Sequence, residues 1–135
     1  MPSLNLDRIK IGYVILIAGR NTAIQTLQRK AGYGDSAKWT HVAGSIGGFD
    51  AVEAKVPQSH VINLQRGYVD KRYEIKVMKR RDQEAAKRYK VALWWATMNN
   101  LPYEGDYLFN KPQESILPAD FDNPELFEEV KDIWI

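Results

Sequence analysis

The chain has 135 residues, of which 44% are hydrophobic and 27% charged, with a formal net charge of +2, and this fits one globular domain and excludes a second. It contains no cysteine and only two histidines, which excludes disulfides and thiol catalysis and gives no reason to expect a metal or cofactor. No apolar run could span a bilayer and no signal peptide is visible, so we expect a cytoplasmic protein without a transmembrane segment.

The first half of the chain predicts strands around one short helix. Residues 9–18 are mostly apolar with several β-branched side chains, which indicates a buried strand. Asn21 can cap a helix that runs to Lys30. Residues 38–46 and 51–56 are typical of two strands, and the glycine-containing turn between them predicts a β-hairpin.

The second half predicts further strands and two helices. Residues 61–64 indicate a short strand, and 73–79 alternate as a half-exposed strand does. A helix over 82–99, apolar nearly all round in its second half, is expected to be buried on most sides. Asn123 followed by Pro124 and an apolar stripe reaching Val130 predicts a short terminal helix. The fold class is therefore α+β.

Charge is unevenly distributed along the sequence. Residues 70–90 hold nine Lys or Arg against four Asp or Glu, whereas residues 104–135 hold nine Asp or Glu against two Lys. The basic part, residues 71–90, predicts either an anion-binding patch or a solvated face that pairs with the acidic C-terminal segment. Aromatic residues do not interleave with these cations as in a stacking surface, so a nucleic acid partner is not favoured.

His41 lies in the predicted strand 38–46, where a period of two places Trp39, His41, Ala43 and Ser45 on one face. An imidazole titrates near neutral pH, as a general base or acid for acyl transfer requires. The alternative is a histidine that only packs in the core or at the surface.

Glu53 lies in the partner strand, and the register of the hairpin decides whether it reaches His41. A turn with an odd number of residues places Ala43 opposite Glu53, with His41 diagonal on the same face, whereas a four-residue turn separates the two side chains. A carboxylate on the imidazole would fix its tautomer, which is the orienting role in nucleophile–base–orienter triads. The alternative is a solvent-facing glutamate on an edge strand.

Hydroxyl nucleophiles are weaker candidates. None of the serines lies in the Gly-x-Ser-x-Gly turn that exposes a nucleophile, and those considered are Ser36, Ser45, Ser59 and Ser115. His60 follows Pro57 in a predicted loop, and we interpret it as a surface residue.

Three short motifs follow one another along the chain. They are Thr40-His41-Val42, Val52-Glu53-Ala54 and Leu101-Pro102-Tyr103-Glu104. In this order the chain resembles the circularly permuted NlpC-type papain-like amidases, which have relatives among lecithin:retinol acyltransferase-like enzymes. The resemblance covers nearly the whole chain. It implies a papain-like antiparallel sheet or small barrel packed against one long helix, with His41 as base and Glu53 as orienter.

The sequence departs from this family in two places. Gly12-Tyr13 stands where the family usually has Gly-Asp, and the helix start with the catalytic cysteine is missing. Ser115 is the hydroxyl nearest to the expected nucleophile position, but a serine needs a well-placed base and oxyanion donors.

The resemblance therefore leaves three functions open. The first is an atypical member without normal cysteine-hydrolase activity, which keeps the His41 and Glu53 cleft to bind a peptidoglycan- or lipid-like ligand. The second is an active hydrolase of amide, ester or thioester bonds, with His41 as base and Ser115 as candidate nucleophile. The third is anion or nucleic acid binding through residues 71–90.

Overall fold

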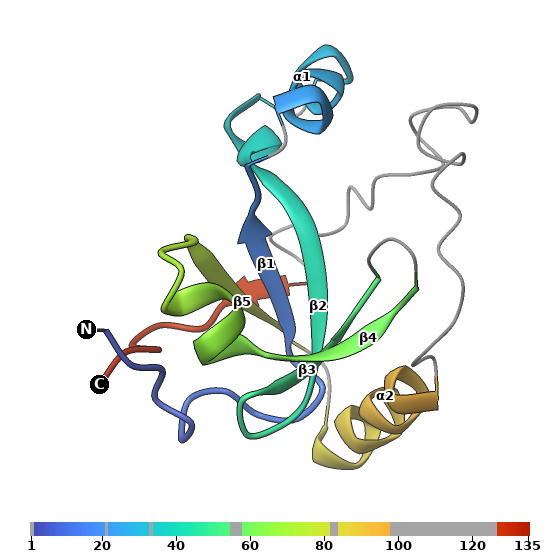
Figure 1. The fold of residues 1–135 in the computed structure, drawn as a ribbon. Coiled ribbons are helices and arrows are strands. Elements are labelled where there is room, and N and C mark those ends of the chain that lie inside the picture. The colour runs from blue at the N-terminus through green and yellow to red at the C-terminus, as the bar shows by residue number, and fades with distance from the viewer. Residues whose placement is uncertain (1, 21, 33, 55–57, 82–83, 98–126) are drawn as a thin grey trace.

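The computed structural model describes residues 2–20, 22–32, 34–54, 58–81, 84–97 and 127–135. Within these ranges no helix has the length and apolar character that crossing a bilayer requires. Figure 1 shows a sheet with a helix near each end of its central strands and with the two termini side by side.

In the part of the chain that the structure describes, the sheet has six antiparallel strands in the order β4-β3-β2-β1-β5-β6. The strands are β1 (Val14–Ala18), β2 (Trp39–Gly47), β3 (Asp50–Glu53), β4 (His60–Asn63), β5 (Ile75–Arg80) and β6 (Phe127–Glu129). The α+β class and the antiparallel sheet are confirmed. Over the described residues the sheet is open, with β4 and β6 at its edges, and it does not close into the small barrel that was the alternative.

Strand β1 is shorter than the expected strand over residues 9–18. Gly12 has a φ of +86°, and the Tyr13 amide donates to the Lys10 carbonyl at 3.2 Å, so the chain turns before Val14. A Cβ at Gly12 would lie 2.7 Å from Arg88, which leaves room only for glycine. Ile9 nevertheless packs in the core, which explains why the apolar run starts before the strand.

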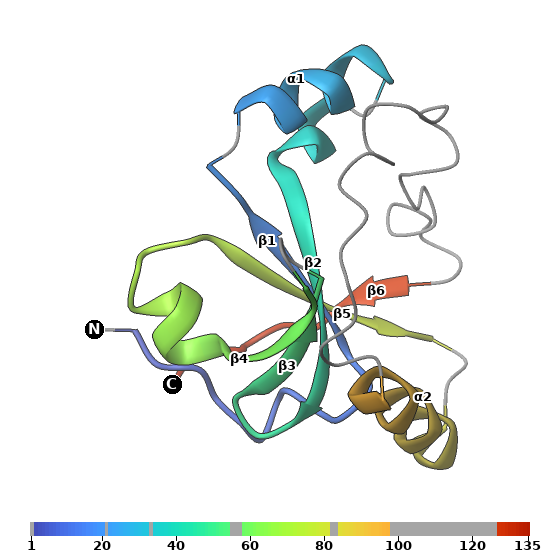
Figure 2. The same cartoon turned by 45° about the vertical axis from the view of Figure 1, so that its right-hand side comes forward.

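The described residues form two α-helices and two short helical turns. They are α1 (Thr22–Lys30), α2 (Ala85–Thr97), the 3-10 turn η1 (Gly34–Lys38) and the π-helical turn η2 (Gln65–Val69). Helix α1 confirms the helix predicted up to Lys30, and α2 lies inside the range predicted for the second helix. Figures 1 and 2 show α1 and α2 at opposite ends of the β1–β2 pair.

Helix α2 is not the buried helix that its apolar sequence predicts. Tyr89, Leu93 and Trp94 are 58%, 66% and 60% exposed, and Ala92 is the buried residue of the helix. The described residues therefore do not show one long helix that covers the sheet, although α2 does contact β2. Trp95 meets β2, where its ring would collide with any Cβ on Gly44. Because α2 contacts the sheet only over a small area, most of its apolar side chains are exposed to solvent.

One face of the sheet carries the hydrophobic core. Ile15, Ile17 and Val77 are at most 1% exposed, and they pack in one cluster with Leu64 and with Tyr68 from η2. The two terminal segments complete this cluster. They pair through the Leu4–Trp134 bridge and through backbone hydrogen bonds of 2.7 and 2.9 Å.

The C-terminal segment contradicts the predicted terminal helix over its described part. Residues 127–129 form β6, with Met78 opposite Glu129 and Arg80 opposite Phe127. Glu128 lies 3.3 Å from the Lys79 ammonium, so charge and ladder hydrogen bonds both favour the strand. The expected cap at residues 123 and 124 lies outside the described residues.

Candidate site around Glu53

The hairpin of β2 and β3 has the register that brings His41 and Glu53 together. Ala43 lies opposite Glu53 and Ser45 opposite Ala51, with the register shifting only near Gly47. The register predicted for a turn with an odd number of residues, with Ala43 opposite Glu53, is therefore confirmed, although Gly47 also pairs with Asp50 beyond the register shift. His41 is diagonal to Glu53 on the same face of the sheet.

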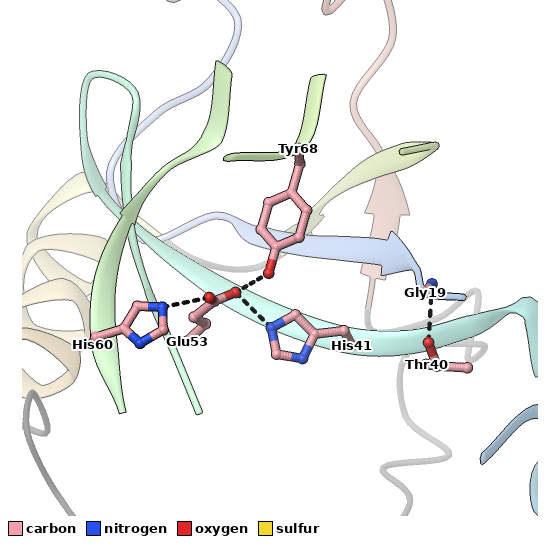
Figure 3. Close-up of polar contacts among 6 residues, drawn as sticks. All are labelled: Gly19, Thr40, His41, Glu53, His60 and Tyr68. Carbon is pink, nitrogen blue, oxygen red and sulfur yellow. Dashed lines mark hydrogen bonds and ion pairs between the residues drawn. The ribbon is translucent and has the colours of Figure 1, made fainter. Parts of the chain in front are cut away.

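Glu53 is the centre of a hydrogen-bonded cluster, which Figure 3 shows. His41 Nε2 lies 2.6 Å from Oε2, and His60 Nε2 lies 2.6 Å from Oε1. The Tyr68 hydroxyl also donates to Oε2. The Glu53 side chain is fully buried, with 0% exposure. Three donors from β2, β4 and η2 therefore replace the water that this carboxylate lost on folding.

The hydrogen bonds keep Glu53 ionised in spite of its burial. Burial alone raises the pKa of Glu53, but the hydrogen bonds from His41, Tyr68 and His60 and the charge of His41 together lower it from 4.5 to about 2. Burial and the bond to Glu53 raise the pKa of the Tyr68 hydroxyl, which stays protonated and donates. A carboxylate only accepts hydrogen bonds, so His41 carries a proton on Nε2.

This arrangement leaves the other ring nitrogen of His41 free to act. Nδ1 has no hydrogen bond to any described residue, and the side chain is 24% exposed. When the imidazole is neutral, its Nδ1 lone pair can accept a proton or a hydrogen bond from a bound molecule. The chemistry available here is therefore that of an oriented base or of a polar binding group.

The ring of Tyr68 packs against Tyr73, which in turn contacts Arg20. The ring of Tyr73 meets that of Tyr68 edge to face at 5.3 Å, and the Arg20 guanidinium lies 3.9 Å above the Tyr73 ring. Arg20 Nη2 also donates to the Lys71 carbonyl at 2.6 Å. These contacts fix the direction from which the Tyr68 hydroxyl approaches Glu53.

The sequence did not identify two members of this cluster. His60, interpreted as a surface residue, lies directly opposite Glu53 in the β3–β4 ladder and binds its Oε1 atom. Its side chain is 38% exposed, so the surface interpretation missed the contact made by the buried end. A predicted strand that started one residue earlier than 61 would have placed His60 on one face of the sheet by strand alternation. Tyr68 lies on η2, and no local sequence pattern predicts that element.

A β-bulge in β2 changes the face on which Trp39 was expected to lie. Ile17 lies opposite His41, but Ala18 lies opposite Trp39, so the register shifts by one residue. The extra residue is Thr40, whose Oγ1 accepts a hydrogen bond from the Gly19 amide at 2.9 Å. Trp39 therefore does not share a face with His41 as a strict period of two predicts.

The candidate hydroxyls do not complete a triad in the described residues. Ser45 is fully buried, and its Oγ has no hydrogen-bond partner within the described part of the chain. Ser59 is 8% exposed. Ser115, the Leu101–Glu104 motif and the side chain of Ser36 lie outside the described residues.

The basic strand β5 pairs with the acidic strand β6. Lys76 lies 3.8 Å from Glu129, and both Lys79 and Arg81 lie 3.3 Å from Glu128. This geometry agrees with a solvated face that meets the acidic C-terminal segment. An open hollow of about 560 Å³ lies beside these strands. Its lining includes Trp39, Lys76, Glu129 and Trp134 but none of the four residues of the Glu53 cluster.

Comparisons with known proteins do not assign a family. No family model, no curated protein and no solved structure matches the chain.

Proposed function

We propose that this chain is an atypical relative of the NlpC-type papain-like amidases, which lacks cysteine-hydrolase activity and uses the site around Glu53 to bind a ligand. The observation that carries the proposal is the 2.6 Å contact between His41 Nε2 and Glu53 in a sequence without cysteine. This contact is the geometry that a base and its orienter require, whereas the sequence lacks the thiol that such a pair would activate.

The fold is consistent with this proposal. His41 on β2 and Glu53 on β3 belong to neighbouring antiparallel strands, as the resemblance implies for the base and its orienter. The proposed ligand is a peptidoglycan- or lipid-like molecule that donates a hydrogen bond to Nδ1 of His41. An amide N–H or a hydroxyl group would supply that donor.

A binding experiment tests the proposal. Soluble peptidoglycan fragments and phospholipid vesicles are titrated into the protein, into His41→Ala and into Val42→Ala. Val42 is adjacent in sequence, 39% exposed and on the opposite face, so it is the matched control. We expect one ligand class to bind, and His41→Ala to weaken binding about tenfold, the equivalent of about 1.4 kcal/mol. Equal binding by both variants would refute a role for the site.

The Nδ1 atom of His41, which no described residue binds, supports a second candidate, an active hydrolase in which His41 is the base. A base can activate water without a side-chain nucleophile, although this is slower than thiol catalysis. Activated esters and acyl thioesters are the test substrates, with the same two variants. Turnover that His41→Ala abolishes and Val42→Ala retains would replace the binding proposal with this one.

A further inference from the structure

The two oxygens of Glu53 are held differently. His41 and Tyr68 both donate to Oε2, whereas His60 is the donor on Oε1 among the described residues. The Glu53 side chain is fully buried, so water cannot easily replace a missing donor. His60 is therefore the one described side chain that restrains this half of the carboxylate.

Restraining both oxygens matters because the last torsion of a glutamate is soft. A terminal sp³–sp² torsion has broad minima, so a carboxylate that is held at one oxygen can rotate its plane. Rotation would misalign Oε2 with the N–H of His41 even if the two atoms stayed close, since hydrogen bonds weaken steeply as they bend. A donor on each oxygen fixes the plane.

The position of His60 suits this restraint. It lies opposite Glu53 in the β3–β4 ladder, and β4 is the edge strand of the sheet. Its ring reaches the buried carboxylate while 38% of its side chain stays exposed. A change of side chain here therefore alters the donor to Oε1 without opening a cavity in the core.

We propose that His60 is a positioning residue that holds the Glu53 carboxylate in the plane required by His41. By donating to Oε1, it keeps Oε2 aligned with the Nε2 proton of His41 and so keeps Nδ1 directed away from Glu53. The role is exerted through Glu53 and needs no contact between His60 and a ligand. It is independent of the proposed function, because it concerns the free protein.

Two variants of similar length separate the donor from the bulk of the side chain. His60→Gln places an amide N–H near the position of Nε2, whereas His60→Met offers no donor. The measurement is the ring N–H proton of His41 in long-range ¹H–¹⁵N NMR spectra of the ligand-free protein. A strongly hydrogen-bonded N–H gives a downfield signal that exchanges slowly with water. Backbone amide spectra confirm the fold of each variant.

We expect the native protein and His60→Gln to show this signal and His60→Met to lose it or to exchange it at least tenfold faster. If His60→Met keeps the native signal, the carboxylate does not need His60 and the proposal is wrong. If His60→Gln loses the signal as completely as His60→Met, restraint by a donor on Oε1 is refuted. Both outcomes are readable whether or not any ligand binds.

Discussion

Two groups of acidic side chains lie toward opposite edges of the same sheet and differ in how they meet water. Glu53, on the β3–β4 side, is fully buried, whereas Glu128 and Glu129, on the β5–β6 side, are 36% and 37% exposed. Glu53 is surrounded by two imidazoles and a phenol. Glu128 and Glu129 meet lysine and arginine side chains that are themselves partly exposed.

The comparison indicates that the burial of each carboxylate, and not the number of its ion pairs, decides how much it contributes to the free energy of unfolding. Exposed pairs gain little because water screens them and because long side chains lose entropy when they pair. A buried carboxylate has no such alternative, so each donor it keeps avoids a large cost. The ion pairs of Glu128 and Glu129 with Lys76, Lys79 and Arg81 are as many as the contacts of Glu53, yet we expect them to contribute less to the free energy of unfolding.

Glu53→Ala should have the largest effect on stability. It leaves the buried Tyr68 hydroxyl without its acceptor, removes the acceptor of two imidazoles and opens a cavity. We expect the free energy of unfolding to fall by about 3 kcal/mol, measured by urea denaturation. Glu128→Ala is the matched control, because it removes a glutamate that is partly exposed. Equal losses in the two variants would contradict the contrast.

Tyr68→Phe tests one donor by itself. The hydroxyl is lost while the ring keeps its edge-to-face contact with Tyr73. Because the bond is made to an ionised and buried acceptor, we expect a loss of about 2 kcal/mol in the free energy of unfolding. Tyr73→Phe serves as the control, since it keeps the same pair of rings. A neutral result for Tyr68→Phe would mean that water or another group replaces the donor.

The sequence could predict the His41–Glu53 contact because that contact depends on two local quantities. Strand alternation gives the face, and the length of the turn gives the register. The contact of His60 depends in addition on the register of β4 against β3, and the sequence pattern alone does not fix that register. The third donor, Tyr68, comes from η2, whose place is set by core packing.

The error at the C-terminus has a different physical origin. Asn123, Pro124 and the apolar stripe are local helix signals, and over a short segment they are weak. The pairing of residues 127–129 with β5 is non-local, and no local pattern encodes it. The bulge at Thr40 is a similar case, because one inserted residue moves Trp39 to the other face of β2 without a change in strand propensity.

Acid should weaken the Glu53 cluster at a lower pH than an ordinary glutamate would require. The pKa of Glu53 is lowered from 4.5 to about 2 in the folded protein, so its contribution is complete above about pH 4.5 and is lost as the pH falls through about 2. Urea unfolding at several pH values, for the native protein and Glu53→Gln, measures this. We expect the difference between the two proteins to shrink toward pH 2. A difference independent of pH would show that the charge of Glu53 is not the stabilising feature.

Glu128→Gln should have the smallest effect, although Glu128 lies near two cations. Both Lys79 and Arg81 approach it at 3.3 Å, but their side chains are 40% and 48% exposed. We expect a change below about 0.5 kcal/mol in the free energy of unfolding, and a smaller one in about 1 M salt. A loss comparable to that of Tyr68→Phe would mean that β6 is held to β5 mainly by charge. Ladder hydrogen bonds and the burial of Val130 and Ile133 are the contacts that we expect to hold the segment in place.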